Sequence, residues 1–344
     1  MSSLQIGLLA AGAVTLLAVV AYNYWVSRKS APRQAEALPS QEPAETLDTQ
    51  EPGAVEPVLT DDFDKLPQPE RKPVLDALID VIATMEVDHP VSGDAALAAL
   101  PATRRVGTKA FNVEGCSELS GEWEPIVPGR RYSAFQAGVQ LANRVGPLNE
   151  IEFSEFVVKT QAFADAVGGS PVFSDMLEEV ARARELDQFA SAHDAQLSVT
   201  LMARAAAWSP GYIQQHAARL GFVAGVIPGR MVLPAQVQGL PPVLSLTFDT
   251  QAALADDPAL SAIRECVLSL DVPQVPRSDQ PFDRLQQAAH MLAEQMDGVI
   301  TDGSGQVLGL DVMQQIGLDL QQLYDALDSR ELSAGSPQAR RLFS

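Results

Sequence analysis

The residue types that carry most enzyme chemistry are present in this sequence, but their spacing forms no catalytic or metal-binding motif. The four histidines are scattered, without i,i+4 pairing and without a cysteine or carboxylate at metal-ligand spacing. They are His89, His193, His216 and His290. Phosphate-binding loops, a dinucleotide-binding glycine pattern and a nucleophile elbow are also missing. We therefore expect no catalytic residues, no metal site and no cofactor.

Two weaker signals have simpler interpretations. The basic turn at residues 127–131 (VPGRR) could hold an anion, but we interpret it as a solvated loop. Asp302, Gly303 and Asp311 could indicate calcium, yet the twelve-residue loop pattern is absent, and a turn explains them better. An enzyme remains an alternative, which a pocket with convergent ionisable side chains would favour.

The charge balance narrows the class of partner. The chain has 44 acidic and 24 basic residues, which gives a formal net charge of −20. Nucleic acid and anionic lipid both attract Lys and Arg, so this balance argues against nucleic acid and against electrostatic membrane binding. Cys116 and Cys266 are the only cysteines, which fits a reducing compartment and gives no redox or metal spacing.

Residues 4–26 (LQIGLLAAGAVTLLAVVAYNYWV) form an uncharged apolar run. A helix of that length, at ~1.5 Å per residue, can cross a hydrocarbon core of about 30 Å. Arg28 and Lys29 follow the run almost at once, so the positive-inside rule predicts a single-pass anchor within residues 1–29, with the N-terminus outside and a cytoplasmic remainder. A secretory signal is the alternative, but no basic region precedes the run, which is too long for such a signal.

Residues 30–73 are rich in Pro, Glu, Gln and Ala and predict a disordered linker. A spacer of this composition would hold the following domain tens of ångströms from the bilayer.

The remaining sequence predicts an α+β fold in two units, residues 74–190 and 191–330, followed by a frayed tail at 331–344. Strands are expected near 75–87, 109–116, 132–144, 196–203, 230–235, 242–248 and 265–273. Helices are expected from Ser92 and Ser209 as N-caps, and at 153–167, 172–188, 281–298 and 310–327. This order indicates antiparallel sheets of the split βαβ type with helices on one face.

Two helices indicate that the units are related copies. Residues 153–169 align without gaps with 282–298, so that Phe153 matches Phe282 and Gly169 matches Gly298. The alternative is that amphipathic helices align because apolar spacing is generic. On this alignment the first copy lacks the hairpin that we expect around Asp302 in the second.

At 281–302 (PFDRLQQAAHMLAEQMDGVITD) the sequence resembles the ZipA family of bacterial cell-division proteins. CVLSLDVP before this stretch and RLGFVAG after the first helix of the same unit also match, and the likeness extends over about 194–327. The order of anchor, Pro-rich linker and C-terminal α+β domain is shared as well.

The resemblance implies a non-enzymatic adaptor at the bacterial inner membrane. ZipA-like proteins tether the tubulin-like division protein FtsZ, and their C-terminal domain receives the C-terminal FtsZ peptide in an apolar groove on the exposed sheet face. Carried onto this sequence, the groove residues are Leu197, Val199, Met231, Leu233, Val243, Val267 and Ser269.

The groove positions match the family only in part. Ser269 stands where the family has a large aromatic residue, and a lost aromatic anchor can cost on the order of 2 kcal/mol of binding. Three explanations are open: the groove lies elsewhere on the sheet, the partner peptide differs from that of the family, or the first copy contributes to peptide binding. Leu197, Val199, Met231 and Leu233 are equally compatible with sheet core, because a slip of one residue exchanges the faces. An adaptor for another divisome protein is the second interpretation.

Overall fold

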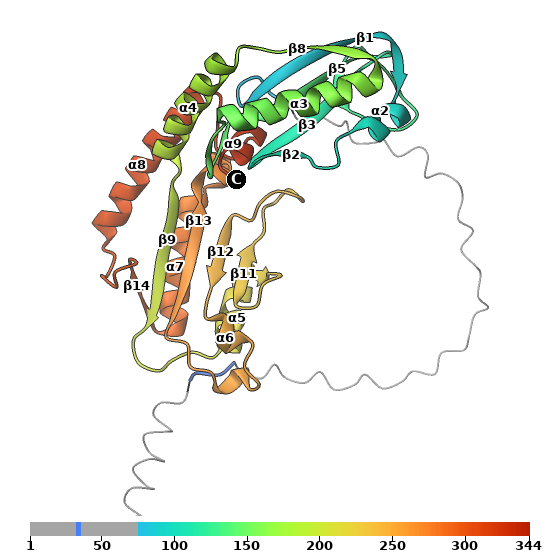
Figure 1. Ribbon diagram of the computed structural model, residues 1–344. Helices are drawn as coiled ribbons and strands as arrows, with labels where there is room; N and C mark the ends of the chain where they lie inside the picture. The colour runs from blue at the N-terminus through green and yellow to red at the C-terminus, as the bar shows by residue number, and fades with distance from the viewer. Residues whose placement is uncertain (1–31, 36–74) are drawn as a thin grey trace, which may run out of the picture. The chain divides into compact units, whose positions relative to one another are not determined.

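The computed structural model describes residues 32–35 and 75–344 (Figure 1). The described chain is a mixed α+β protein with antiparallel sheets, and it divides into two compact units. The N-terminal unit comprises residues 75–193 and 341–344, and the C-terminal unit comprises residues 194–340 with 32–35. Within this part of the chain no helix has the length and apolar character needed to cross a bilayer. The predicted anchor, residues 4–26, lies outside it.

The N-terminal unit is built around a six-stranded antiparallel sheet in the order β2-β3-β5-β1-β8, with β4 paired to β3. Its elements are β1 (Asp80–Ser92), α2 (Gly93–Ala99), β2 (Arg105–Val106), β3 (Lys109–Ser117), β4 (Trp123–Pro125), β5 (Arg131–Gln140), β6 (Ala142–Asn143), β7 (Gly146–Pro147), α3 (Glu150–Val167), β8 (Gly169–Val172) and α4 (Met176–His193).

Apolar alternation and helix caps explain these elements. On β1 the side chains of Val81, Ala83 and Met85 are buried, as the alternating sequence predicts. Ser92 caps α2 by accepting a hydrogen bond from the Ala95 amide at 3.2 Å, which confirms that prediction. Asn149 forms a capping box at the start of α3, a signal that we had not used.

The end of the chain differs from the prediction. We expected residues 331–344 to be frayed, but Pro337–Leu342 form helix α9. In the N-terminal unit, Leu342 and Phe343 are each 1% exposed. The tail is therefore part of the folded structure because its apolar side chains have a core to enter.

The C-terminal unit contains a second six-stranded antiparallel sheet, in the order β10-β11-β12-β13-β9-β14. Its elements are β9 (Gln196–Ala203), α5 (Pro210–Arg219), β10 (Val223–Ala224), β11 (Arg230–Leu233), β12 (Leu244–Thr247), α6 (Thr250–Ala253), η2 (Pro258–Leu260), β13 (Glu265–Asp271), η3 (Val272–Gln274), η4 (Arg277–Asp279), α7 (Pro281–Met296), β14 (Gly298–Thr301) and α8 (Leu310–Ser329).

Helix α7 packs against β9, β13 and β14, and lies behind β9 and β13 in Figure 1. Its buried side chains recur at helical spacing and include Leu285, Ala289, Leu292 and Met296. Ser209 caps α5 by accepting from the Tyr212 amide at 3.2 Å, as predicted. One face of the C-terminal sheet is thus closed by apolar packing.

Four strands have the same order and direction in both units. The order is β3-β5-β1-β8 in one and β12-β13-β9-β14 in the other, and every pairing is antiparallel. The aligned helices also end alike, since Gly168 and Asp297 both have left-handed backbones, with φ of 67° and 54°. Strand β8 occupies the place of β14, but α4 begins at Met176, directly after β8. The hairpin around Asp302, where Thr301 pairs with Val307, therefore has no counterpart in the first copy, as expected.

Residues 32–35 also differ from expectation. They belong to the predicted linker, residues 30–73, yet Arg33 forms a parallel β-bridge with Trp208 in the C-terminal unit. Residues 36–74 lie outside the described chain.

Candidate functional site

The two faces of the C-terminal sheet differ in burial. Directly opposed residues of an antiparallel sheet share a face, so the pairs Val199–Leu268 and Met231–Leu246 define the face covered by helices. These four side chains are at most 5% exposed. This face is the core of the unit.

The opposite face is lined by small and polar side chains that are half-buried or exposed. One cross-strand row runs through Val232, Ser245, Ser269 and Ser198, and the next runs through Arg230, Thr247, Val267 and Thr200. We call these two rows the open sheet face. A peptide laid across it would meet hydroxyl groups between two half-buried valines.

The structure does not bring the seven predicted groove residues together. Leu197 is opposite Leu270, and Leu233 is opposite Leu244, so both lie on the core face with Val199 and Met231. The predicted phase for these four was wrong by one residue, because β9 and β11 alternate apolar side chains toward the helices.

Three predicted residues remain. Val267 and Ser269 lie on the open sheet face, as expected. Val243 precedes β12 and is 1% exposed, with its amide donating to the Leu233 carbonyl at 2.8 Å. It is therefore a buried structural residue and offers no surface to a partner.

The surroundings of Ser269 explain the weak match to the family groove. Its cross-strand neighbours are Ser245 and Ser198, so three small hydroxyl side chains meet at the centre of the sheet. Asp249, which follows β12, caps α6 by accepting from the Gln251 amide at 2.8 Å. The centre of the open sheet face is therefore formed by small hydroxyl side chains and not by an aromatic anchor.

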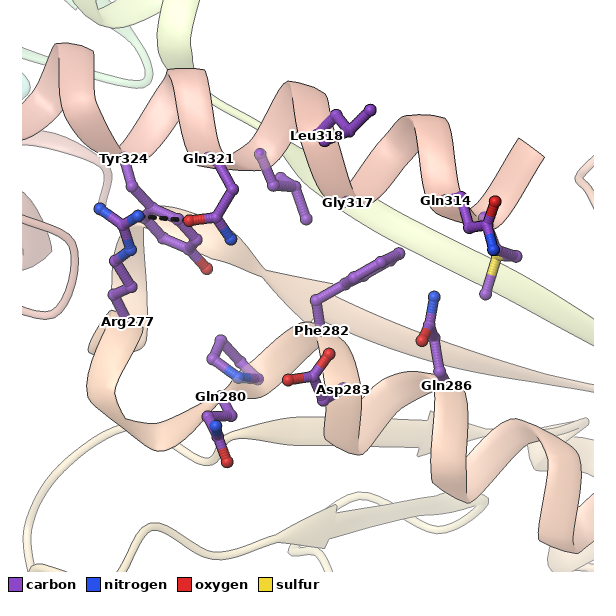
Figure 2. A pocket seen from close by; sticks show the side chains of 13 residues that line it. Arg277, Gln280, Phe282, Asp283, Gln286, Gln314, Gly317, Leu318, Gln321 and Tyr324 are labelled. Carbon is purple, nitrogen blue, oxygen red and sulfur yellow. Dashed lines mark hydrogen bonds between the residues drawn. The ribbon is translucent and has the colours of Figure 1, made fainter. Parts of the chain in front are cut away.

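A cavity of about 690 Å³ lies between α7 and α8, away from the predicted groove residues. Its lining is mixed, with Phe282, Met313 and Leu318 beside several glutamine side chains. Figure 2 shows Phe282 projecting from α7 toward α8. Gly317 faces this ring, and a Cβ at that position would lie 3.4 Å from it, at ordinary contact distance.

Tyr324 and Arg277 close one end of this cavity. The Arg277 guanidinium lies 5.5 Å from the Tyr324 ring centroid and pairs with Asp325 at 2.9 Å and with Gln321. The Tyr324 hydroxyl is buried and has no hydrogen-bond partner within residues 32–35 and 75–344, and burial raises the pKa of this phenol to about 12. We had not singled out either residue, and helical spacing alone marks Tyr324 only as a core position.

The other chemistry-bearing residues have structural roles. The Nδ1 of His216 lies 3.1 Å from the Gln295 side-chain oxygen, and burial raises the pKa of Cys266 to about 12. The Asp302 carboxylate accepts from the Ser304 and Gln306 amides, which confirms the predicted turn. Residues 32–35 and 75–344 contain no group of three or more side chains placed to hold a metal ion.

Comparison with known proteins does not assign this chain to a family. No family model and no curated protein matches this chain. Among solved structures, a match is the berberine bridge enzyme from Eschscholzia californica, with 11% identity over 76% of this chain and a TM-score of 0.16. The match spans 53% of that enzyme, and a TM-score this low does not support a shared fold. The fold thus defines a class, a two-unit α+β protein with antiparallel sheets.

Proposed function

We propose that this protein is a membrane-anchored adaptor of bacterial cell division, which binds the C-terminal peptide of FtsZ and tethers the division ring to the inner membrane. Residues 4–26 serve as the bilayer anchor, and the folded units act in the cytoplasm without catalysis. The proposal starts from the likeness of residues 281–302 to the ZipA family and from the predicted order of anchor, linker and domain.

One structural observation supports it most directly. The C-terminal sheet buries one face under helices and leaves Val232, Val267 and their polar neighbours half-buried on the other. A rigid sheet with one uncovered face can receive an extended or helical peptide whose apolar side chains contact the valines. Most of the affinity would come from a few such contacts.

The N-terminal unit enters the proposal as a tandem copy. The shared strand order and the aligned left-handed helix ends favour duplication followed by divergence. In that case both units would retain the helix-covered sheet of a single ancestral unit. The second copy carries the proposed receptor face, because the sequence likeness falls within it.

The polar centre of the open sheet face favours a second candidate, an adaptor for a different cytoplasmic divisome protein. Ser269 stands where the resemblance implies a large aromatic residue, and Ser198 and Ser245 are its cross-strand neighbours. A partner segment with more hydrogen-bonding groups than the FtsZ peptide would suit this surface better.

The test is co-sedimentation of the full chain, reconstituted in vesicles, with FtsZ filaments. We expect vesicles to sediment with FtsZ and to lose this association when FtsZ lacks its C-terminal peptide. Binding that persists without the peptide would contradict the proposed peptide site. Failure to bind either form would contradict the FtsZ proposal.

A further inference from the structure

Arg33 lies in the sequence just after the predicted anchor, and its backbone extends a short β-ladder of the C-terminal unit. Its amide donates to the Ala207 carbonyl at 2.7 Å, and its carbonyl accepts from the Ser209 amide at 2.9 Å. Trp208, between them, also pairs antiparallel with Ile263. Arg33 therefore occupies the position of a third strand, which is how proteins often bind extended segments.

The Arg33 side chain ends at the C-terminus of α7. Its guanidinium donates to the Asp297 carboxylate at 2.8 Å and to the Met296 carbonyl at 3.3 Å. The carbonyls at a helix C-terminus carry partial negative charge, so a cation is favourable here. The contact is thus specific for a basic side chain.

The base of this site is rigid. The Trp208 side chain is fully buried, and its indole Nε1 donates to the same Met296 carbonyl at 2.8 Å. A Cβ at Gly298 would lie 3.3 Å from the indole ring, so β14 passes close against it. The ladder edge and the helix end are therefore held in place by contacts within the C-terminal unit.

The next two residues contact the C-terminal unit through their side chains. The Gln34 side-chain Nε2 donates to the Ala259 carbonyl at 3.4 Å. The Ala35 Cβ lies 3.7 Å from the position that a Cβ at Gly211 would take. Three consecutive residues thus each have a defined neighbour on the C-terminal unit.

We propose that residues 32–35 are a strap that docks in cis on the C-terminal unit through Arg33, and that docking sets how far this unit extends from the membrane. Arg33 is seven residues after residue 26, the end of the predicted anchor, a reach of at most about 25 Å. With the strap released, the tether extends to residue 74, which permits roughly 160 Å of contour length. The membrane distance depends on the proposed anchor, whereas the docking itself does not.

Disulfide trapping in the full chain tests the docking directly. We would pair Ala35→Cys with Gly211→Cys in a Cys116→Ser background, because their Cβ separation matches the ~3.8 Å typical of disulfides. Cys266 can stay, since it is buried. The Gly211 position has space for a side chain: among the described residues outside its own helix turn, a Cβ there would meet only Ala35 within 4 Å. Mild oxidation followed by mass spectrometry reports the intramolecular bond.

The matched control pairs Ala35→Cys with Ala218→Cys, which lies on the same side of α5 but about 10 Å further along. We expect the 35–211 bond to form at least tenfold faster than the 35–218 bond. Adding Arg33→Glu should remove most of that advantage, and Arg33→Lys should retain part of it. Equal rates for the two pairs, or a rate unaffected by Arg33→Glu, would overturn the proposal. FtsZ binding does not enter this readout, so the two proposals fail separately.

Discussion

Arg341, near the C-terminus, forms a two-pronged ion pair with Asp80 at the start of β1. Its guanidinium donates to Asp80 Oδ1 at 2.5 Å and to Oδ2 at 2.8 Å, across 261 positions of sequence. The Asp80 side chain is 0% exposed and also accepts from the Asp76 amide at 2.9 Å. The Arg341 carbonyl accepts from Gln140 on the neighbouring strand β5. The chain end thus closes the edge of the N-terminal core.

Removing only the arginine of this ion pair should destabilise the N-terminal unit strongly. We expect Arg341→Ala to lower its free energy of unfolding by about 3–5 kcal/mol, because the variant leaves a buried carboxylate without its cation. Arg131→Ala is the matched control in the same unit, since Arg131 pairs with Glu118 at the surface and should change stability by less than about 1 kcal/mol. Urea denaturation measures both, and equal effects would contradict the role of Arg341.

The same variant should show a characteristic pH dependence. Burial raises the pKa of Asp80, while the hydrogen bonds and charge of Arg341 oppose that rise. A carboxyl with a higher pKa in the folded than in the unfolded protein makes folding less favourable as pH rises between the two values. Without Arg341 the pKa of Asp80 in the folded protein rises further above its value in the unfolded protein. The loss of unfolding free energy in Arg341→Ala should therefore be larger at pH 7 than at pH 4. A constant deficit would contradict this electrostatic explanation.

Local sequence signals predicted most elements of the fold. Strand β9 has the predicted bounds, Gln196–Ala203, and Ser92 and Ser209 cap the predicted helices. These features depend on neighbouring residues, through side-chain alternation and through hydrogen bonds to the next few amides.

Contacts between distant residues explain what the sequence analysis missed. The pairing of Arg341 with Asp80 carries no local signal, so the tail looked unstructured. The docking of Arg33 beside Trp208 was hidden in the same way, within a Pro-rich stretch. For the groove, Leu197 and Val199 have the same apolar alternation whichever face they occupy, so packing against α7 decides their direction.

Substitutions at adjacent residues of β13 test the assignment of the two sheet faces. Leu268 is fully buried, so Leu268→Ala should cost about 2–5 kcal/mol in the unfolding of the C-terminal unit. Val267→Ala, one residue earlier on the half-buried face, should cost less than about 1.5 kcal/mol. Denaturation of both variants measures the difference, and a reversed order would mean that the faces are exchanged.

Tyr324→Phe should leave the stability of the C-terminal unit unchanged or raise it by about 1 kcal/mol. The substitution removes a buried hydroxyl that finds no hydrogen-bond partner in the described part of the chain, and it keeps the ring beside Arg277. Alkaline titration at a phenolate absorption wavelength should also lose the component near pH 12. A clear loss of stability would show that the hydroxyl has a partner in solution.

Ser269→Phe should strengthen binding to the FtsZ C-terminal peptide, by roughly tenfold. The serine lies between two other serines, so an aromatic ring there would add apolar contact area for the peptide. Ser120→Phe places the same ring on an exposed loop of the other unit and controls for general hydrophobicity. Fluorescence anisotropy with a labelled peptide measures both, and tighter binding by the control alone would contradict the location of the site.

The most direct measurement of the central claim compares two lysine substitutions in the full chain for binding to FtsZ. Val267→Lys introduces a charge at the middle of the open sheet face, whereas Val226→Lys alters a fully exposed valine in the same unit. We predict that Val267→Lys weakens binding at least tenfold while the fold is retained, and that Val226→Lys has no effect. Unchanged binding by a folded Val267→Lys variant would contradict the claim that this face receives the peptide.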